Sequence, residues 1–195
     1  MSAKAVPTFR FPEGACIAQA QPDMNRPVSL NSPAVQVMTD LTLVRAATIQ
    51  PDAAINIAEQ TMIHQGVRML FVVEKYPCVD GIVTAAALVG DRTLKAMHRR
   101  GVRREEVCVA DIMETLPSLD VVLLSDVERA TVGNLVSTLA KFGKPHLLVL
   151  EAASPQGGPR IRGLISHTQI ERQLGQALPM AEIATTFVEI ERALV

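Results

Sequence analysis

Two hydroxyl side chains stand at corresponding places in two similar stretches of the sequence. The first stretch ends in Gly81-Ile82-Val83-Thr84 and the second in Gly163-Leu164-Ile165-Ser166. Each tetrapeptide is apolar enough for a strand, and each precedes a stretch of helical character. A Thr or Ser at such a junction predicts a helix N-cap, whose hydroxyl is available to the exposed N–H groups of the first turn.

The side chains that could hold a metal or attack a substrate do not form a recognisable constellation. The histidines are His64, His98, His146 and His167, and the cysteines are Cys16, Cys78 and Cys108. Neither set has metal-ligand spacing, and no C-x-x-C occurs. The sequence also lacks a G-x-S-x-G, a P-loop and a G-x-G-x-x-G motif. We therefore expect no catalytic residue, no metal and no required cofactor.

Composition sets the limits within which these residues act. The chain has 195 residues, of which 48% are hydrophobic and 3% aromatic, and it carries a formal net charge of -1. This predicts an aliphatic core in one compact domain or two small ones. The charge argues against a broad nucleic-acid footprint. A basic stretch at 92–104 is either a solvated connecting helix or a local anion or partner site.

No segment of the sequence indicates export or membrane insertion. The first residues lack the pattern of a signal peptide, and no apolar run approaches the ~20 residues that span a bilayer. We therefore expect a soluble, cytoplasmic protein.

The elements of the first repeat follow from hydrophobic spacing and turn residues. We expect a helical turn at 37–40, a strand at 48–50, and strands at 69–73 and 79–83. Pro51 and Asp52 are expected to open a helix that ends at Gly66. Thr84 then caps a further helix, which Gly90 interrupts.

The second repeat has the same order of elements. We expect a turn at 109–113, a strand within 119–124, and strands at 147–150 and 161–165. Asp126 is a candidate N-cap for a helix that ends at Gly143. Ser166 is expected to cap another helix, ending at Gly175.

The expected organisation has five parts. Prolines are dense in the first part and deny donors to regular structure, while the last part has an apolar stripe at helical spacing. The parts are an extended N-terminal arm (1–34), a first repeat (35–90), a basic connecting helix or linker (91–108), a second repeat (109–175) and a C-terminal helix (176–195).

The doubled G-[IL]-[IV]-[TS] ending and the V-x-x-[IV]-M opening together resemble a tandem CBS-domain pair, or Bateman module. The resemblance implies an α+β fold of two β-α-β-β-α repeats packed with pseudo-twofold symmetry. It implies two pockets between the repeats that take AMP, ADP, ATP or S-adenosylmethionine. It also implies homodimers that regulate an unidentified partner protein and perform no chemistry.

The resemblance also implies a polar residue that this chain lacks in one repeat. Nucleotide-binding members end the motif in G-h-x-[TS]-x-x-[DN], whose last side chain accepts from ribose hydroxyls. Ala87 and Gln169 stand at that position here. An unpaired buried hydroxyl costs about 1–3 kcal/mol. We therefore expect weak binding at unequal pockets, with the Ser166–Gln169 side the better one. The alternative is a structural dimer whose pockets bind nothing.

The expected ligand-contacting residues come from the strand entries and helix starts of both repeats. His146 and His167 are candidate phosphate partners, and Arg68 and Lys144 are weaker ones; plain surface or core roles remain open for each. The full set is Thr48, Arg68, Met69, Thr84, Val121, His146, Ser166, His167 and Gln169.

Overall fold

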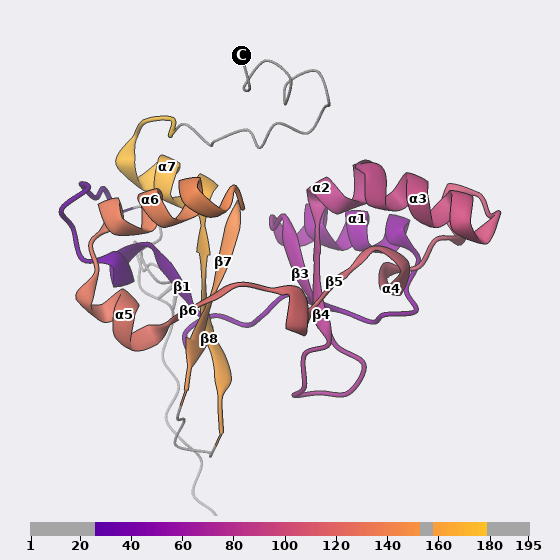
Figure 1. Ribbon diagram of the computed structural model, residues 1–195, viewed down its shortest axis with the longest axis horizontal. Helices are drawn as coiled ribbons and strands as arrows, with labels where there is room; N and C mark the ends of the chain where they lie inside the picture. Colours follow the sequence, from indigo (N-terminus) through magenta and orange to yellow (C-terminus); the bar gives the residue numbers. More distant parts are fainter. Residues whose placement is uncertain (1–25, 153–157, 179–195) are drawn as a thin grey trace, which may run out of the picture.

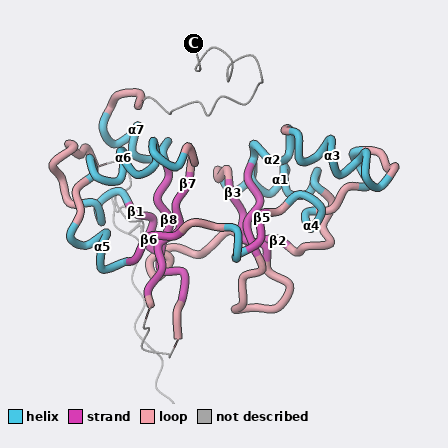
Figure 2. Tube along the Cα trace, viewed as in Figure 1, coloured by secondary structure: helices cyan, strands magenta, loops and turns pink. Residues whose placement is uncertain are grey.

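The protein consists of two α/β units that lie side by side (Figure 1). The computed structural model describes residues 26–152 and 158–178. Figure 2 shows the strands of both units toward the middle of the molecule, with most helices on the outer sides. The predicted α+β architecture of two repeats is confirmed.

The first unit is built around the sheet β2-β3-β4-β5. Its elements are β2 (Thr48–Ile49), α1 (Ile55–Gln65), β3 (Met69–Val72), β4 (Gly81–Thr84), α2 (Ala85–Val89), α3 (Asp91–Arg100), the 3-10 turn η2 (Arg104–Glu106), α4 (Val109–Ile112) and β5 (Glu114–Thr115).

The second unit is built around the sheet β1-β8-β7-β6, and the 3-10 turn η3 (Leu116–Ser118) leads into it. Its elements are η1 (Ala34–Val37), β1 (Met38–Asp40), β6 (Val121–Leu123), α5 (Leu124–Arg129), α6 (Val132–Phe142), β7 (His146–Glu151), β8 (Arg160–Ser166) and α7 (His167–Leu174).

The two repeats exchange their opening strands. β1 opens the first repeat but pairs with β8, and β5 opens the second repeat but pairs with β4. The expected helical turn at 37–40 is therefore wrong for residues 38–40, because the backbone there is extended to pair with Gly163, Leu164 and Ile165. Each sheet is complete only with a strand from the other repeat.

The repeated glycine allows this exchanged strand to approach closely. A Cβ atom on Gly81 would lie 2.3 Å from the backbone oxygen of Glu114 in β5. A Cβ atom on Gly163 would lie 2.8 Å from the Met38 side chain in β1. The glycine of each G-[IL]-[IV]-[TS] motif is thus required by the strand that crosses it.

Strand residues alternate between two faces of each sheet. Leu70, Val72 and Val83 pack under the helices of the first unit. Leu147, Val149 and Ile165 do the same in the second. The opposite faces meet between the sheets, where Met69, Phe71, Val73, Ile82 and Leu148 form a shared cluster. We call this cluster the inter-sheet core; it joins the units through apolar contact.

Helix α1 begins later than expected. It starts at Ile55 rather than at Pro51–Asp52, because the preceding backbone bonds to another segment. The N–H of Val109 donates to the carbonyl of Ala53 at 2.8 Å, and the N–H of Ile55 donates to Val107 at 3.0 Å. These bonds hold 51–54 outside the helix.

The helix boundaries of the second unit differ from the expectation at two N-caps. Asp126 lies inside α5, and Thr131 caps α6 by accepting from the N–H of Asn134 at 3.3 Å. Ser166 stands at the N-cap of α7 but makes no capping hydrogen bond. The expected stops at Gly66, Gly143 and Gly175 are confirmed, each with a positive φ.

Both expected terminal parts lie partly outside the residues that the structure describes. Residues 1–25 of the expected arm and 179–195 of the expected C-terminal helix lie outside the described residues. The described end of the arm runs along the second unit. There the N–H of Val28 donates to Gln173 at 3.0 Å, and Leu30 accepts from the N–H of Gly133 at 2.8 Å.

Candidate functional site

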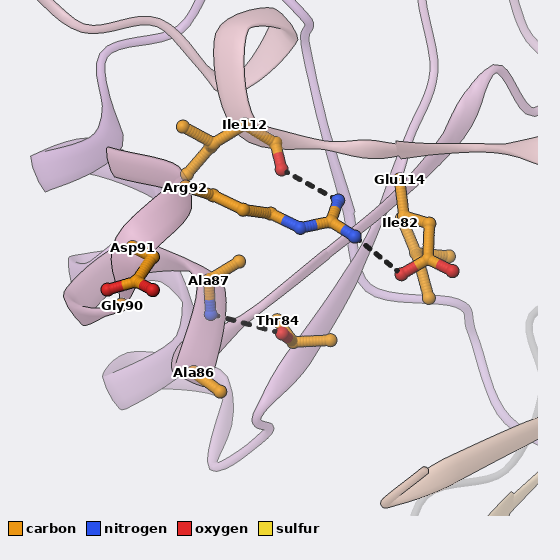
Figure 3. Close-up of a pocket in the computed structure, with 9 residues that line it drawn as sticks. All are labelled: Ile82, Thr84, Ala86, Ala87, Gly90, Asp91, Arg92, Ile112 and Glu114. Carbon is orange, nitrogen blue, oxygen red and sulfur yellow. Dashed lines mark hydrogen bonds and ion pairs between the residues drawn. The ribbon is translucent and has the colours of Figure 1, made fainter. Parts of the chain in front are cut away.

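A cavity of about 250 Å³ lies where β4 passes into α2 (Figure 3). The Thr84 hydroxyl accepts a hydrogen bond from the N–H of Ala87 at 3.3 Å, which confirms the predicted cap. The lining consists of Ile82, Thr84, Ala86, Ala87, Gly90, Asp91, Arg92, Ile112 and Glu114. We call this space the Thr84 cavity.

Arg92 spans the Thr84 cavity from the start of α3 toward β5, as Figure 3 shows. Its Nη2 lies 3.3 Å from Oε2 of Glu114. Its Nη1 donates to the backbone carbonyls of Ile112 and Met113, both at 3.4 Å. The first repeat therefore supplies a guanidinium, and the opening strand of the second repeat supplies a carboxylate.

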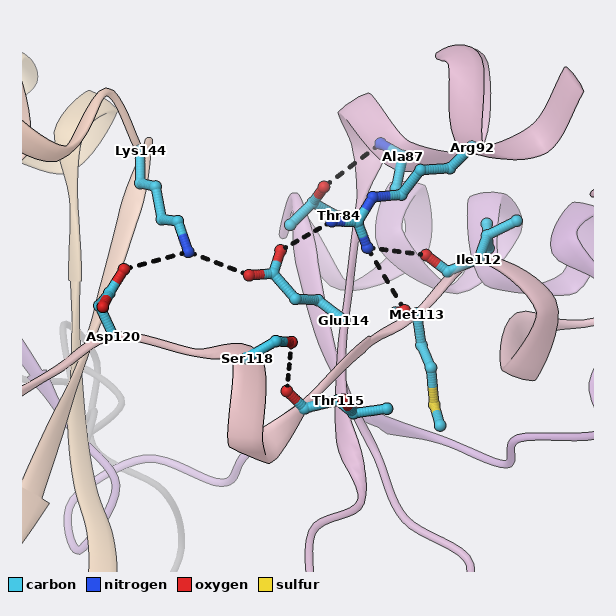
Figure 4. A network of polar contacts seen from close by, with 10 residues as sticks. All are labelled: Thr84, Ala87, Arg92, Ile112, Met113, Glu114, Thr115, Ser118, Asp120 and Lys144. Atoms are coloured by element: carbon cyan, nitrogen blue, oxygen red, sulfur yellow. Dashed lines mark hydrogen bonds and ion pairs between the residues drawn. The ribbon is translucent and has the colours of Figure 1, made fainter. Parts of the chain in front are cut away.

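Lys144 extends this network to the second unit (Figure 4). Its Nζ lies 3.0 Å from Oε1 of Glu114 and 3.4 Å from Oδ2 of Asp120. Burial acts to lower the pKa of Lys144, but the hydrogen bonds and charges of Glu114 and Asp120 outweigh it and raise the pKa above its ordinary value. Lys144 is therefore charged at neutral pH, and Glu114 links both units.

The Thr84 cavity is small and carries both signs of charge. Its volume is below the ~300–1,000 Å³ typical of ligand pockets, so a nucleoside-sized ligand would fill it and extend beyond it. Asp91 and Glu114 line it as carboxylates and Arg92 as a cation. These groups can accept hydrogen bonds from hydroxyls and donate to an anion.

The corresponding junction of the second repeat brings three predicted residues together. His146 pairs with Ser166 across β7 and β8, as Met69 pairs with Thr84 across β3 and β4. The N–H of His167 donates to the carbonyl of Pro145 at 2.9 Å. The His167 ring faces Glu171, with Nδ1 3.4 Å from Oε2.

His146 is the most strongly perturbed titratable group of this junction. Its Nδ1 is buried and has no hydrogen-bond partner among the described residues. Burial, with a smaller contribution from the positive charge of Arg68, lowers the pKa of His146 to about 4. The ring is therefore neutral at pH 7, which removes the charge that a phosphate partner would use.

The remaining predicted site residues lie around the sheets rather than in one place. Thr48 is exposed on β2, and Val121 is 45% exposed on β6. Met69 is buried in the inter-sheet core. Gln169 lies in the first turns of α7, where its Oε1 accepts from Arg172 at 3.5 Å. One of the nine predicted residues, Thr84, is among the residues that line this cavity; the other eight are not.

The sequence did not indicate Glu114 as a member of a site, and it indicated Arg92 only as part of the basic stretch at 92–104, one interpretation of which is an anion or partner site. Glu114 was overlooked because the opening segment of the second repeat was taken for a turn and not for a strand that joins β4. Their positions relative to the V-x-x-[IV]-M opening at 109–113 could have indicated both residues: Glu114 follows it directly, and Arg92 lies in the stretch before it.

The arginines of the basic stretch are largely neutralised. Arg99 and Arg100 both contact Asp111, Arg103 contacts Glu106, and Arg104 contacts Glu59. This pairing favours a solvated connecting role for residues 99–104, whereas Arg92 at the start of α3 lines the Thr84 cavity. The pairing leaves little of the unpaired positive charge that nucleic-acid binding uses.

The described part of the chain offers neither a metal-binding cluster nor a membrane-spanning helix. Within residues 26–152 and 158–178, no group of three or more His, Cys, Asp or Glu could hold a metal ion. Over the same ranges, no helix has both the length and the apolar composition that crossing a bilayer requires.

Comparison with known proteins gives matches of structure. The sequence matches no protein-family model and no curated protein. An uncharacterized conserved protein from Pyrococcus horikoshii matches 79% of this chain and 100% of its own length, with 16% identity and a TM-score of 0.53. The CBS domain of a bacterial CNNM/CorC family Mg2+ transporter, in complex with an inhibitor, matches 77% of this chain and 81% of its own, with 16% identity and a TM-score of 0.50.

These likenesses define the fold. The fold of the two units is that of a tandem CBS-domain pair, as the repeated motifs predicted. With both structures, 16% of the aligned residues are identical, and the similarity is one of fold.

Proposed function

We propose that this chain is a non-enzymatic regulatory module that binds an adenosine-type ligand in the Thr84 cavity and acts through a partner protein. The observation that carries the proposal is the cavity itself. It lies at the β4–α2 junction, and residues from both repeats line it. A bound ligand would therefore contact segments of both repeats.

The missing ribose acceptor at Ala87 has nearby substitutes. Asp91 and Glu114 line the same cavity as Ala87, and carboxylates accept hydrogen bonds from hydroxyl pairs. The Thr84 hydroxyl and Arg92 supply further polar contacts. We therefore prefer the Thr84 side over the Ser166–Gln169 side, where the neutral His146 offers no charge to a phosphate.

A thermal-shift series tests the proposal. Adenosine, AMP, ADP, ATP and S-adenosylmethionine are each added at millimolar concentration to the purified chain. At least one should raise Tm, because a ligand that binds only the folded state stabilises it. Thr84→Val, which keeps the shape but removes the hydroxyl, should reduce the shift, whereas Ser166→Ala should not. Absence of any shift with all five ligands would contradict ligand sensing.

A structural dimer with inactive pockets is the second candidate, and Ala87 favours it. If missing chemistry at that position explains an absence of binding, Ala87→Asp should create affinity for AMP. Titration calorimetry on both proteins decides this. An Ala87→Asp variant that still fails to bind would remove Ala87 as the explanation.

Homodimer formation is proposed through the exposed apolar face of α1 and α2. Ile63 is 72% exposed and Val89 is 71% exposed, and a groove runs between them past Met62 and Leu88. A second copy would cover these side chains. Sedimentation velocity should show a dimer that Ile63→Glu converts to a monomer. A wild-type monomer at micromolar concentration would contradict it.

A further inference from the structure

We propose that Glu114 is an internal counter-anion of the Thr84 cavity, which a ligand carrying several phosphate groups must displace to reach Arg92 and Lys144. The inference deepens the proposed function and rests on it in one respect, that the cavity is a ligand site. It assigns the selectivity of that site to one carboxylate.

The geometry places one carboxylate between two cations. Oε2 of Glu114 faces Arg92 at 3.3 Å, and Oε1 faces Lys144 at 3.0 Å (Figure 4). A phosphate chain presents anionic oxygens to the same kinds of donor. Glu114 and such a ligand therefore compete for the same two side chains.

The fold does not require this network. The side chains of Arg92, Glu114 and Lys144 are 50%, 24% and 32% exposed, and ion pairs at this exposure add little stability. The pseudo-symmetric second unit provides an internal comparison. Thr39 pairs with Leu164 there, as Glu114 pairs with Ile82.

Lys144, the second cation that contacts Glu114, also has no charged counterpart in the other repeat. Lys144 comes two residues before His146, and the corresponding position before Met69 is Val67. The exchanged strand of the second unit has Thr39 at the Glu114 position, and its own carboxylate, Asp40, pairs instead with Arg162. The charged trio is thus a property of the Thr84 cavity and not of the CBS-pair fold.

The charge balance sets the class of ligand. Two cations, Arg92 and Lys144, stand among three carboxylates, Glu114, Asp91 and Asp120. A polyanion that enters beside Glu114 meets net negative charge, and the repulsion grows with the charge of the ligand, so that a neutral nucleoside is repelled least. The native cavity therefore selects against phosphate chains.

Displacement would also loosen a connection between the units. Glu114 belongs to the sheet of the first unit, while Lys144 begins the strand entry of the second. A ligand that takes Lys144 from Glu114 replaces a fixed contact by one that depends on occupancy. The charge of the ligand therefore determines whether the contact between Glu114 and Lys144, which joins the two units, stays in place.

Inorganic tripolyphosphate tests the inference without any nucleoside. Titration calorimetry is carried out on the full chain as wild type, Glu114→Gln and Asp120→Asn. Glu114→Gln should bind tripolyphosphate at least about tenfold more tightly than wild type, because the competing charge is gone while the size is kept. Asp120→Asn removes a charge beside Lys144 but outside the cavity lining, and should change the affinity by less than about threefold.

Two further variants serve as controls for this result. Glu114→Thr copies the residue that the second unit tolerates at this register, so it should fold and show the same gain. Adding Arg92→Gln to Glu114→Gln should abolish the gain. Equal affinity of wild type and Glu114→Gln, including no binding by either, would overturn the inference. So would an equal gain in Asp120→Asn, or a gain that survives loss of Arg92.

The outcome is separable from that of the proposed function. Adenosine carries no phosphate, and its binding to wild type depends on the cavity and not on the exchange of Glu114. A gain for tripolyphosphate without adenosine binding supports the counter-anion and contradicts the adenosine ligand. Adenosine binding without the gain does the reverse.

Discussion

Ala87 lines the Thr84 cavity at a position where nucleotide-binding motifs of similar sequence carry a carboxylate or an amide. Its methyl group can accept no hydrogen bond, but the carboxylates of Asp91 and Glu114 lie in the same lining. If the cavity binds a ligand as proposed, its polar contacts come from residues around the motif and not from the last residue of the motif.

Among single residues, His146 gives the clearest prediction of a pH-dependent free energy of unfolding. Its pKa is lowered from 6.5 to about 4, so the unfolded chain takes up a proton that the folded chain refuses. The contribution of neutral His146 to the free energy of unfolding is fully present above pH 6.5. It falls as the pH is lowered and is gone below about pH 4. Between pH 7 and pH 5 the loss is on the order of 2 kcal/mol.

A His146→Met variant isolates this effect, because Met69 occupies the corresponding position in the first repeat. Urea unfolding of both proteins at pH 7 and pH 5 gives the free energies. The wild type should lose about 2 kcal/mol more than the variant on acidification. Equal losses in the two proteins would show that burial and Arg68 do not hold His146 neutral.

At the scale of elements, two hydroxyl residues at helix starts of the second repeat behave differently. Thr131 shares a reciprocal cap with Asn134 at the start of α6, whereas Ser166 makes no capping bond at the start of α7. Thr131→Ala should therefore lower the free energy of unfolding by about 1 kcal/mol. Ser166→Ala should change it by less than about 0.5 kcal/mol. Urea midpoints measure both, and the reverse order would contradict the assignment.

The exchanged strands make a second prediction at this scale. A methyl group on Gly81 would overlap the Glu114 backbone, so Gly81→Ala should cost about 2–3 kcal/mol and disturb β5. Gly66→Ala is the control: its Cβ meets no atom within 4 Å, and the cost of its positive φ is about 1 kcal/mol. A Gly81→Ala protein as stable as Gly66→Ala would mean that β5 does not lie against Gly81.

At the scale of the whole molecule, we expect the inter-sheet core to make the two units unfold together. Phe71 of the first sheet and Leu148 of the second are both buried in it. Phe71→Ala should lower the free energy of unfolding by about 3 kcal/mol. Amide hydrogen exchange should report this loss equally for Leu70 in β3 and Val149 in β7. Unchanged protection of Val149 would show that the units unfold independently.

The sequence predicted the architecture well because hydrophobic spacing and stop glycines are local signals. Gly66, Gly143 and Gly175 end helices as expected. The exchange of β1 and β5 could not be seen, because two or three extended residues leave no periodic pattern and their partners lie far along the chain. The start of α1 was misplaced for a similar reason, since backbone bonds to 107–110 hold the preceding residues outside the helix.

The candidate site was predictable in part. Thr84 is a local feature of a strand–helix junction, and its cap was foreseen from the motif. Arg92, Glu114 and Lys144 meet only after β5 joins β4 and the units pack together. A site assembled from three separate segments has no spacing that a single sequence could display.

The measurement that tests the central claim most directly is a titration of the ¹⁵N-labelled chain with AMP, followed by amide chemical shifts. If the Thr84 cavity is the ligand site, the amides of 84–92 and of Glu114 should shift in a saturable way, and those of 166–169 should shift little. Saturable shifts confined to 166–169 would contradict the account. So would the absence of a saturable shift with AMP and with each of the other four ligands of the thermal-shift series.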